Sequence, residues 1–173
     1  MPNIVYNNCV VAGKPENVKT FIKKYCCGNL KNHTLNLDFN KIIPEPMSKK
    51  GLDPKYLIDE NSYCEVLEDR PWFDWYEWHV DNWGTKWNAY DPQPECEKNT
   101  DKVVYTLNFN TAWSAPIPIW DKLKNISQDL GLEITVTACE EFEDFDYEVT
   151  FEKGKCTYSD CPDFKKDKKP KTK

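Results

Sequence analysis

Two hydrophobic periods follow one another in residues 103–131, VVYTLNFNTAWSAPIPIWDKLKNISQDLG. The first is an alternation carried by Val103, Tyr105, Leu107 and Phe109. Alternation of this kind predicts a half-buried strand. The second advances by four, three and four residues through Ile119, Leu123, Ile126 and Leu130. That spacing predicts one face of an amphipathic helix, and Gly131 supplies its end.

The start of the chain shows the same succession of strand and helix. Residues 4–11 are rich in β-forming side chains and end near Gly13. A helical stripe follows at Val18, Phe21, Ile22 and Tyr25. Gly28 supplies the predicted stop of this helix. A second alternation, which predicts another strand ending before Pro44, is carried by Leu35, Leu37 and Phe39.

The rest of the chain supplies an insertion and a hairpin. Residues 47–70 are polar and lack a sustained period, so we expect an inserted loop. From Pro71 to Gly84 the sequence predicts a short helix that is aromatic over much of its circumference. Residues 134–138 and 145–152 predict two more strands, paired as a C-terminal hairpin.

The predicted order, β-α-β, insertion, β-α-β-β, indicates an α+β fold of the split β-α-β kind. Both main helices then cover one face of the sheet, and the other face stays open for a ligand, a partner or a second copy of the chain. With 173 residues, of which 39% are apolar, the chain fits a single domain. We assign residues 1–161 to that domain, with the insertion at about 47–90, and expect the lysine-rich residues 162–173 to be disordered.

The chain carries no signal for export or for a membrane span. No stretch reaches the roughly 20 apolar residues of a membrane helix, and the start lacks a basic segment followed by an apolar run. We therefore expect a cytoplasmic protein in which the eight cysteines are reduced. Because the cysteines include no Cys-x-x-Cys pair and the chain has two histidines, the sequence predicts no structural metal and no cofactor.

The predicted domain is acidic. The formal net charge is −6, and the last twelve residues hold six lysines and two aspartates. That local charge of +4 leaves −10 on residues 1–161. An acidic surface repels phosphates, so the charge disfavours DNA or RNA as a ligand and suits either protein binding or solubility.

Four motifs in a fixed order carry a resemblance to a known family. They are MPN at 1–3 with Tyr6-Asn7, FNKIIPEP at 39–46, NWGTKWNA at 82–89 and TAWSAP at 111–116. Together they resemble the YubB-type ferredoxin-like proteins carried by bacteriophages and plasmids, over most of residues 1–152. The resemblance implies a ferredoxin-like fold and an origin in a mobile element or its bacterial host, and it implies no reaction.

The NWGTKWNA motif and Trp113 have two interpretations. In the first, Gly84 ends a helix and the tryptophans bury their large rings in the core. In the second, the rings stack on a flat ligand such as a nucleotide or cyclic nucleotide, and Lys86 meets its polar edge. The candidate ligand-binding residues are Asn82, Trp83, Lys86, Trp87, Trp113 and Ser114. The sequence has no Gly-x-Gly or P-loop pattern that would cradle a phosphate.

His79 is the candidate for acid–base chemistry. Carboxylates suited to orient its imidazole lie nearby, at Asp74, Glu77 and Asp81. A histidine in an aromatic helix also serves as a packed core residue, and the sequence has no Gly-x-Ser-x-Gly motif. We therefore assign no catalytic residue.

Carboxylates are concentrated between residues 140 and 148. They are Glu140, Glu141, Glu143, Asp144, Asp146 and Glu148. Such a cluster suits a basic protein partner, and a solvated hairpin explains it as well. It lacks the glycine and the ligand spacing of an EF-hand calcium loop. We take the first five as the candidate partner-binding residues.

Three functions of different classes follow from these observations. The leading one is a non-enzymatic accessory protein of a phage or plasmid that binds a host protein, with inhibition of a bacterial defence system as its expected service. The second is a nucleotide or cyclic-nucleotide binding protein that sequesters a signal in the tryptophan pocket, with a homodimer as one arrangement. The third is a small enzyme that acts on a nucleotide through His79.

Overall fold

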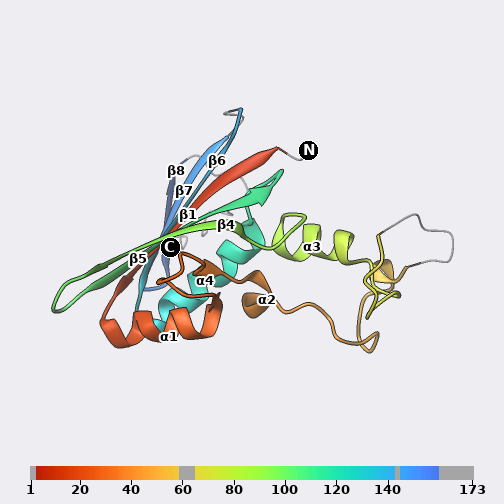
Figure 1. Ribbon diagram of the computed structural model, residues 1–173, viewed down its shortest axis with the longest axis horizontal. Coiled ribbons are helices and arrows are strands. Elements are labelled where there is room, and N and C mark those ends of the chain that lie inside the picture. Colours follow the sequence, from red (N-terminus) through yellow and green to blue (C-terminus); the bar gives the residue numbers. More distant parts are fainter. Residues whose placement is uncertain (1–2, 59–64, 143–144, 160–173) are drawn as a thin grey trace, which may run out of the picture.

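The computed structural model describes residues 3–58, 65–142 and 145–159 (Figure 1). The strands of its main sheet are β1 (Ile4–Gly13), β4 (Tyr90–Lys98), β5 (Val103–Ala112), β6 (Glu133–Glu140), β7 (Asp146–Glu152) and β8 (Lys155–Ser159). They lie in the order β4-β5-β1-β6-β7-β8, each antiparallel to its neighbours. Two short strands, β2 (Cys26–Cys27) and β3 (Asn36–Leu37), pair separately. The helices are α1 (Pro15–Tyr25), α2 (Phe39–Ile42), α3 (Trp75–Trp83) and α4 (Ile117–Leu130), with a 3-10 turn η1 (Pro54–Tyr56).

The fold is a mixed α+β arrangement, with α1 and α4 on one face of the sheet (Figure 1). Strand side chains that alternate toward the interior are buried, among them Val5, Cys9 and Val11 on β1 and Ile134, Val136 and Ala138 on β6. The side chains between them belong to the opposite face, where Tyr6 is exposed and Thr137 is half-buried. β1 and β6 confirm the strands predicted over residues 4–11 and 134–138.

Both predicted main helices are present, but one ends earlier than its glycine suggested. α4 buries Ile119, Leu123 and Ile126 of the predicted stripe and ends at Gly131, which has a left-handed φ of 60°. α1 buries Val18 and Phe21 of its predicted face, but it stops at Tyr25 and not at Gly28. The reason is that Cys26 already has an extended backbone and pairs with Leu37.

The strand predicted over residues 35–39 is wrong. Only the two residues of β3 pair with another strand. Asp38 then caps α2, because its side chain accepts a hydrogen bond from the Asn40 N–H at 3.1 Å. The Phe39 N–H donates to the Asn88 side chain (2.9 Å) and not to a neighbouring strand. Leu35, Leu37 and Phe39 are all buried. The alternation therefore predicted their burial correctly and their backbone conformation incorrectly.

The sequence did not predict β4 and β8, which lie at the two edges of the main sheet. β4 has the sequence YDPQPECEK, in which two prolines and four charged residues leave no hydrophobic alternation. An edge strand tolerates proline because one of its sides has no partner strand. β8 pairs with β7 and extends the predicted C-terminal hairpin of β6 and β7.

The insertion packs against the start of α3. The Ile58 N–H donates to the Trp72 carbonyl (3.0 Å), and the Asp74 N–H donates to the Tyr56 carbonyl (2.9 Å). Figure 1 shows this part of the chain beyond α3, away from the sheet. Residues 162–173, predicted to be disordered, lie outside the described residues. In the described ranges, no helix is long and apolar enough to cross a membrane.

α3 shares the interior of the sheet, as the sequence predicted. Its buried residues are Trp75, Trp78, His79 and Trp83. Phe39 connects this helix to the sheet, because its ring meets Trp83 and Phe109 edge to face, with centroids 6.0 Å and 5.9 Å away. The helix therefore belongs to the same core as the strands.

Candidate functional site

Lys86 lies among four aromatic rings. The distances from its Nζ to the ring centroids are 5.0 Å for Trp87, 5.6 Å for Trp113, 5.7 Å for Tyr76 and 5.8 Å for Trp75. Each distance falls within the ~6 Å over which a ring attracts a cation. Among residues 3–58, 65–142 and 145–159, no carboxylate forms an ion pair with this ammonium. The rings are therefore its main partners.

Thr85 brings Lys86 beside Trp113. It follows Gly84, which ends α3 with a left-handed φ of 81°. The buried Thr85 hydroxyl donates to the Ala112 carbonyl (2.9 Å) and accepts from the Ala112 N–H (3.1 Å). The chain that leaves α3 is thus attached to the last residue of β5. This geometry explains Gly84 and Thr85 of the NWGT motif.

Trp113 has a left-handed backbone, with φ 70°. For a residue with a bulky side chain, such a conformation costs on the order of 1–3 kcal/mol. Hydrogen bonds hold the backbone on both sides. The Trp113 N–H donates to the Asn3 carbonyl (2.9 Å), and the Ser114 carbonyl accepts from the Thr111 hydroxyl (2.8 Å). Strained residues that the surrounding structure holds in this way are concentrated at functional sites.

Tyr76, Lys86, Trp87 and Trp113 form a surface that we call the aromatic patch. Its three rings are exposed by 40%, 38% and 43% in chain order. Tyr76 meets Trp113 edge to face at 6.1 Å, and Trp87 meets Tyr90 in the same way at 6.1 Å. Contiguous exposed rings of this kind are typical of binding surfaces.

The structure brings together three of the six predicted ligand-binding residues, namely Lys86, Trp87 and Trp113. Trp83 lies in the core, where it is 2% exposed and its ring stacks on His79 at 3.9 Å. A ligand on the exposed rings does not reach it. The Ser114 hydroxyl donates to the Gly84 carbonyl, and so supports the same turn as Thr85.

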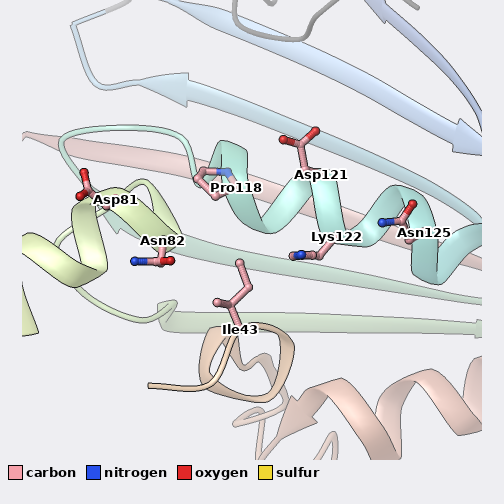
Figure 2. A pocket seen from close by; sticks show the side chains of 7 residues that line it. All are labelled: Ile43, Asp81, Asn82, Pro118, Asp121, Lys122 and Asn125. Carbon is pink, nitrogen blue, oxygen red and sulfur yellow. The ribbon is translucent and has the colours of Figure 1, made fainter. Parts of the chain in front are cut away.

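Asn82 faces a separate cleft of about 330 Å³ between α3 and α4 (Figure 2). The cleft is lined by Ile43, Asp81, Asn82, Pro118, Asp121, Lys122 and Asn125. The Lys55 ammonium (2.6 Å) and then the Tyr56 hydroxyl (3.1 Å) lower the pKa of Asp81 by hydrogen bonding to its carboxylate. Asn82 donates to the Trp78 carbonyl (2.9 Å). Both side chains therefore hold local structure, and Asn82 is not part of the aromatic patch.

His79 is buried in a charged cluster with Glu45 and Arg70. Its Nε2 lies 2.5 Å from Glu45 Oε1, and Glu45 Oε2 accepts a hydrogen bond from Arg70 Nη2 at 2.6 Å. Its Nδ1 lies 2.8 Å from the Lys86 carbonyl oxygen. The hydrogen bond from His79, and then the one from Arg70, lower the pKa of Glu45, which is therefore a carboxylate. The Lys86 carbonyl accepts a hydrogen bond from Nδ1, and Nε2 contacts the Glu45 carboxyl group, so both imidazole nitrogens are engaged.

This geometry gives His79 a structural role. Both nitrogens are engaged within the protein and the residue is 7% exposed, so it is not placed to take a proton from a substrate. Two of the three carboxylates predicted to orient it are engaged elsewhere, and the third, Glu77, is exposed. Asp74 caps α3 by accepting from the Glu77 N–H (3.1 Å), and Asp81 binds Lys55. The hypothesis of an enzyme loses its candidate base.

Sequence reasoning missed the cluster in which Glu45 contacts both His79 and Arg70. Glu45 lies 34 residues from His79 and 25 from Arg70, so no local spacing points to these contacts. One signal was present, since Arg70 is the single arginine of the chain. Its guanidinium donates to Glu45 and, at 3.2 Å, to the Pro46 carbonyl, a pair of contacts that a lysine ammonium does not reproduce.

The predicted acidic cluster is only partly at the surface. Glu140 is 3% exposed, and its carboxylate accepts hydrogen bonds from the Asn3 side chain and the Phe142 N–H, each at 2.7 Å. It therefore holds local structure. The other candidates are Glu141 and Asp146, which are exposed, and Glu143 and Asp144, which lie outside the described residues. In the described part of the chain, no group of three or more His, Cys, Asp or Glu is placed to hold a metal ion.

Comparisons with known proteins find a distant structural similarity. No family model matches the chain, and no curated protein matches it significantly. Among solved structures, the chain is similar to protein api92 from Yersinia pseudotuberculosis, which is assigned to the family DUF1281. The TM-score is 0.38 at 13% sequence identity, and the similarity covers 52% of this chain and 32% of that chain. A similarity at this level assigns no function.

Proposed function

We propose that the protein is a non-enzymatic accessory protein of a phage or plasmid that binds a bacterial host protein through the aromatic patch. We propose that this binding inhibits a host defence system. The resemblance of four sequence motifs to the YubB-type proteins supports the origin in a mobile element. The exposed rings around Lys86 support the binding.

A ferredoxin-like arrangement of the domain is part of the proposal. The chain order β1-α1-β4-β5-α4-β6 supports it, and so does the sheet order β4-β5-β1-β6. β7 and β8 then extend the sheet beyond β6. Because one fold serves unrelated functions, the proposal for binding depends on the patch and not on the fold.

Three properties of the aromatic patch suit a protein interface. Tyrosine and tryptophan supply large rigid contact area, and both are enriched among the residues that dominate binding energy. Trp113 keeps an unfavourable backbone conformation while its ring stays 43% exposed, so a partner that covers the ring would add contacts that the chain itself does not supply. Lys86 has no carboxylate partner among the described residues and is available to a carboxylate of the partner.

Affinity capture from bacterial lysate with matched baits tests the proposal. The baits are the wild type, a Trp87→Ala and Trp113→Ala double variant, and a control that removes two exposed apolar side chains of the insertion, Met47→Ala with Val66→Ala. We expect the wild type and the control to capture the same host protein and the patch variant to lose it. Titration with the purified partner should reproduce the difference. Capture that does not depend on the patch, or no specific capture at all, would refute the proposal.

A nucleotide is the second candidate ligand, because Lys86 lies beside exposed rings on which a base can stack. Stacking contributes roughly 1–3 kcal/mol per base, and a lysine can meet a phosphate. A nucleotide at about 100 times its dissociation constant should raise the free energy of unfolding by about 2.7 kcal/mol. Thermal shift with nucleotides and cyclic nucleotides measures this, and Lys86→Ala should remove much of the shift. If no nucleotide shifts the melting temperature, this candidate is rejected and protein binding remains.

A further inference from the structure

A groove separate from the aromatic patch runs between α1 and the β4–β5 hairpin. Its volume is about 370 Å³, within the ~300–1,000 Å³ range of small-molecule sites. Figure 1 shows α1 beside the part of this hairpin that extends away from α3. The lining residues that bear on binding are Val18, Lys19, Ile22, Lys98, Val103 and Tyr105.

The floor of the groove is apolar. Val18 and Val103 are buried, and Ile22 and Tyr105 are half-buried. Burial is the main cause that raises the pKa of Tyr105, as expected for a phenol held away from water. A ligand with an apolar body gains free energy by covering such a surface.

Two lysines border this floor, Lys19 on α1 and Lys98 at the end of β4. Both are exposed, and neither forms an ion pair with another residue of the described ranges. A lysine stem can cover apolar surface while its ammonium stays in water. Two like charges at one groove repel each other, and an anion that binds both removes this repulsion.

We propose that the groove binds a small amphipathic carboxylate. Its apolar body lies on the floor of valine and isoleucine side chains, and its carboxylate meets Lys19 and Lys98. Medium-chain acyl and aryl-substituted acids have this chemistry. An alcohol of the same length lacks the charge, and a cation of the same length is repelled by the two ammonium groups. The site shares no residue with the aromatic patch, so it does not depend on the function proposed for the patch.

Decanoate is the probe. It is titrated into the full chain and followed by calorimetry, at decanoate concentrations below those at which it forms micelles. We expect saturable binding to the wild type. A Lys19→Gln and Lys98→Gln double variant should bind roughly tenfold more weakly, because it lacks two surface ion pairs with the ligand. Lys23→Gln with Lys31→Gln is the matched control, since it removes the same charge from exposed lysines outside the groove. The control should keep the affinity of the wild type.

Ile22→Trp tests the apolar floor. A larger ring at this half-buried position fills the groove and should abolish decanoate binding. Circular dichroism and thermal melting establish whether the variant folds. If it does not fold, the affinities of the two lysine double variants for decanoate test the proposal instead. Three results would overturn the proposal: no saturable binding of decanoate, equal binding of decanoate and decyltrimethylammonium, or equal affinities of the two lysine double variants.

Discussion

His79 and Lys86 are two basic side chains among aromatic rings, and they differ in what else they contact. His79 is buried, stacks on Trp83 at 3.9 Å and hydrogen-bonds to the carboxylate of Glu45. Lys86 is half-buried among four rings and has no carboxylate partner in the described part of the chain. A hydrogen bond from His79 Nδ1 to the Lys86 carbonyl joins the two environments.

The aromatic cluster around His79 is structural and the one around Lys86 is accessible. The difference between them lies in whether the basic side chain contacts a carboxylate. A buried polar side chain such as His79 needs hydrogen-bonding partners, because removing an unpaired polar group from water is costly. A cation at the surface keeps part of its hydration and needs no such partner, so it stays available for binding. The same types of residue, within one short stretch of sequence, therefore serve folding in one place and recognition in the other.

The largest expected effect separates the two kinds of tryptophan. Trp83→Ala removes a ring that is 2% exposed and should lower the free energy of unfolding by about 3–5 kcal/mol. Trp113→Ala removes a ring that is 43% exposed and should lower it by about 1 kcal/mol or less. Urea denaturation followed by circular dichroism measures both losses. Equal losses would show that the two rings do not differ in role.

Removing the carboxylate beside His79 should lower the free energy of unfolding by about 3 kcal/mol at neutral pH. Glu45→Gln leaves the buried Arg70 guanidinium without its counter-charge and removes the carboxylate that His79 contacts. Glu77→Gln is the control, because Glu77 is exposed and forms no ion pair within the described ranges. The control should change stability by less than about 0.5 kcal/mol. A loss as small as that of the control would argue against a charged cluster.

The contribution of Glu45 should also depend on pH. Hydrogen bonds from His79 and Arg70 lower the pKa of Glu45 from its ordinary value of 4.5. Because the pKa is lower in the folded than in the unfolded state, the stabilisation is present above the ordinary value and is lost as the pH falls through the folded-state value. The difference between wild type and Glu45→Gln should therefore shrink on acidification. Urea midpoints across the acid range check this, and a difference that stays constant would contradict it.

Lys86→Gln should have a small effect on stability. An exposed cation–π contact contributes about 0.5–1 kcal/mol, so we expect a loss of about 1 kcal/mol or less. The same variant should weaken capture of the protein partner, and Lys122→Gln in the separate cleft should not. Denaturation and capture are measured on the same preparations. If Lys86→Gln unfolds the protein, then Lys86 belongs with His79 among the structural residues.

The last expected effect is a gain of one substitution over another. Glycine adopts the φ of 70° found at Trp113 without strain, whereas alanine does not. Trp113→Gly should therefore be more stable than Trp113→Ala by roughly 1 kcal/mol, although glycine is usually the less stabilising residue. A comparison of their melting temperatures provides the measurement. If Trp113→Ala is the more stable of the two, the backbone at this position is not strained.

Local patterns predicted the elements of the fold better than the partners of the site. The alternation in β5 and the stripe in α4 were confirmed, because each is a regular period over an uninterrupted segment. β4 escaped prediction because an edge strand carries prolines and charges. Glu45 and Arg70 were not predicted because the contacts of Glu45 with Arg70 and with His79 join separate parts of the chain.

By itself, the sequence determined which segments bury an apolar face, since the periods of helix and strand are properties of the local backbone. It also placed the tryptophans and Lys86 in one candidate site. Only the tertiary structure decided which ring faces solvent. The indole of Trp83 is drawn into the core, where it donates to the distant Ile43 carbonyl (2.9 Å), while Thr85 attaches Lys86 to the end of β5. Exposure depends on such contacts between distant residues, and a local pattern does not contain them.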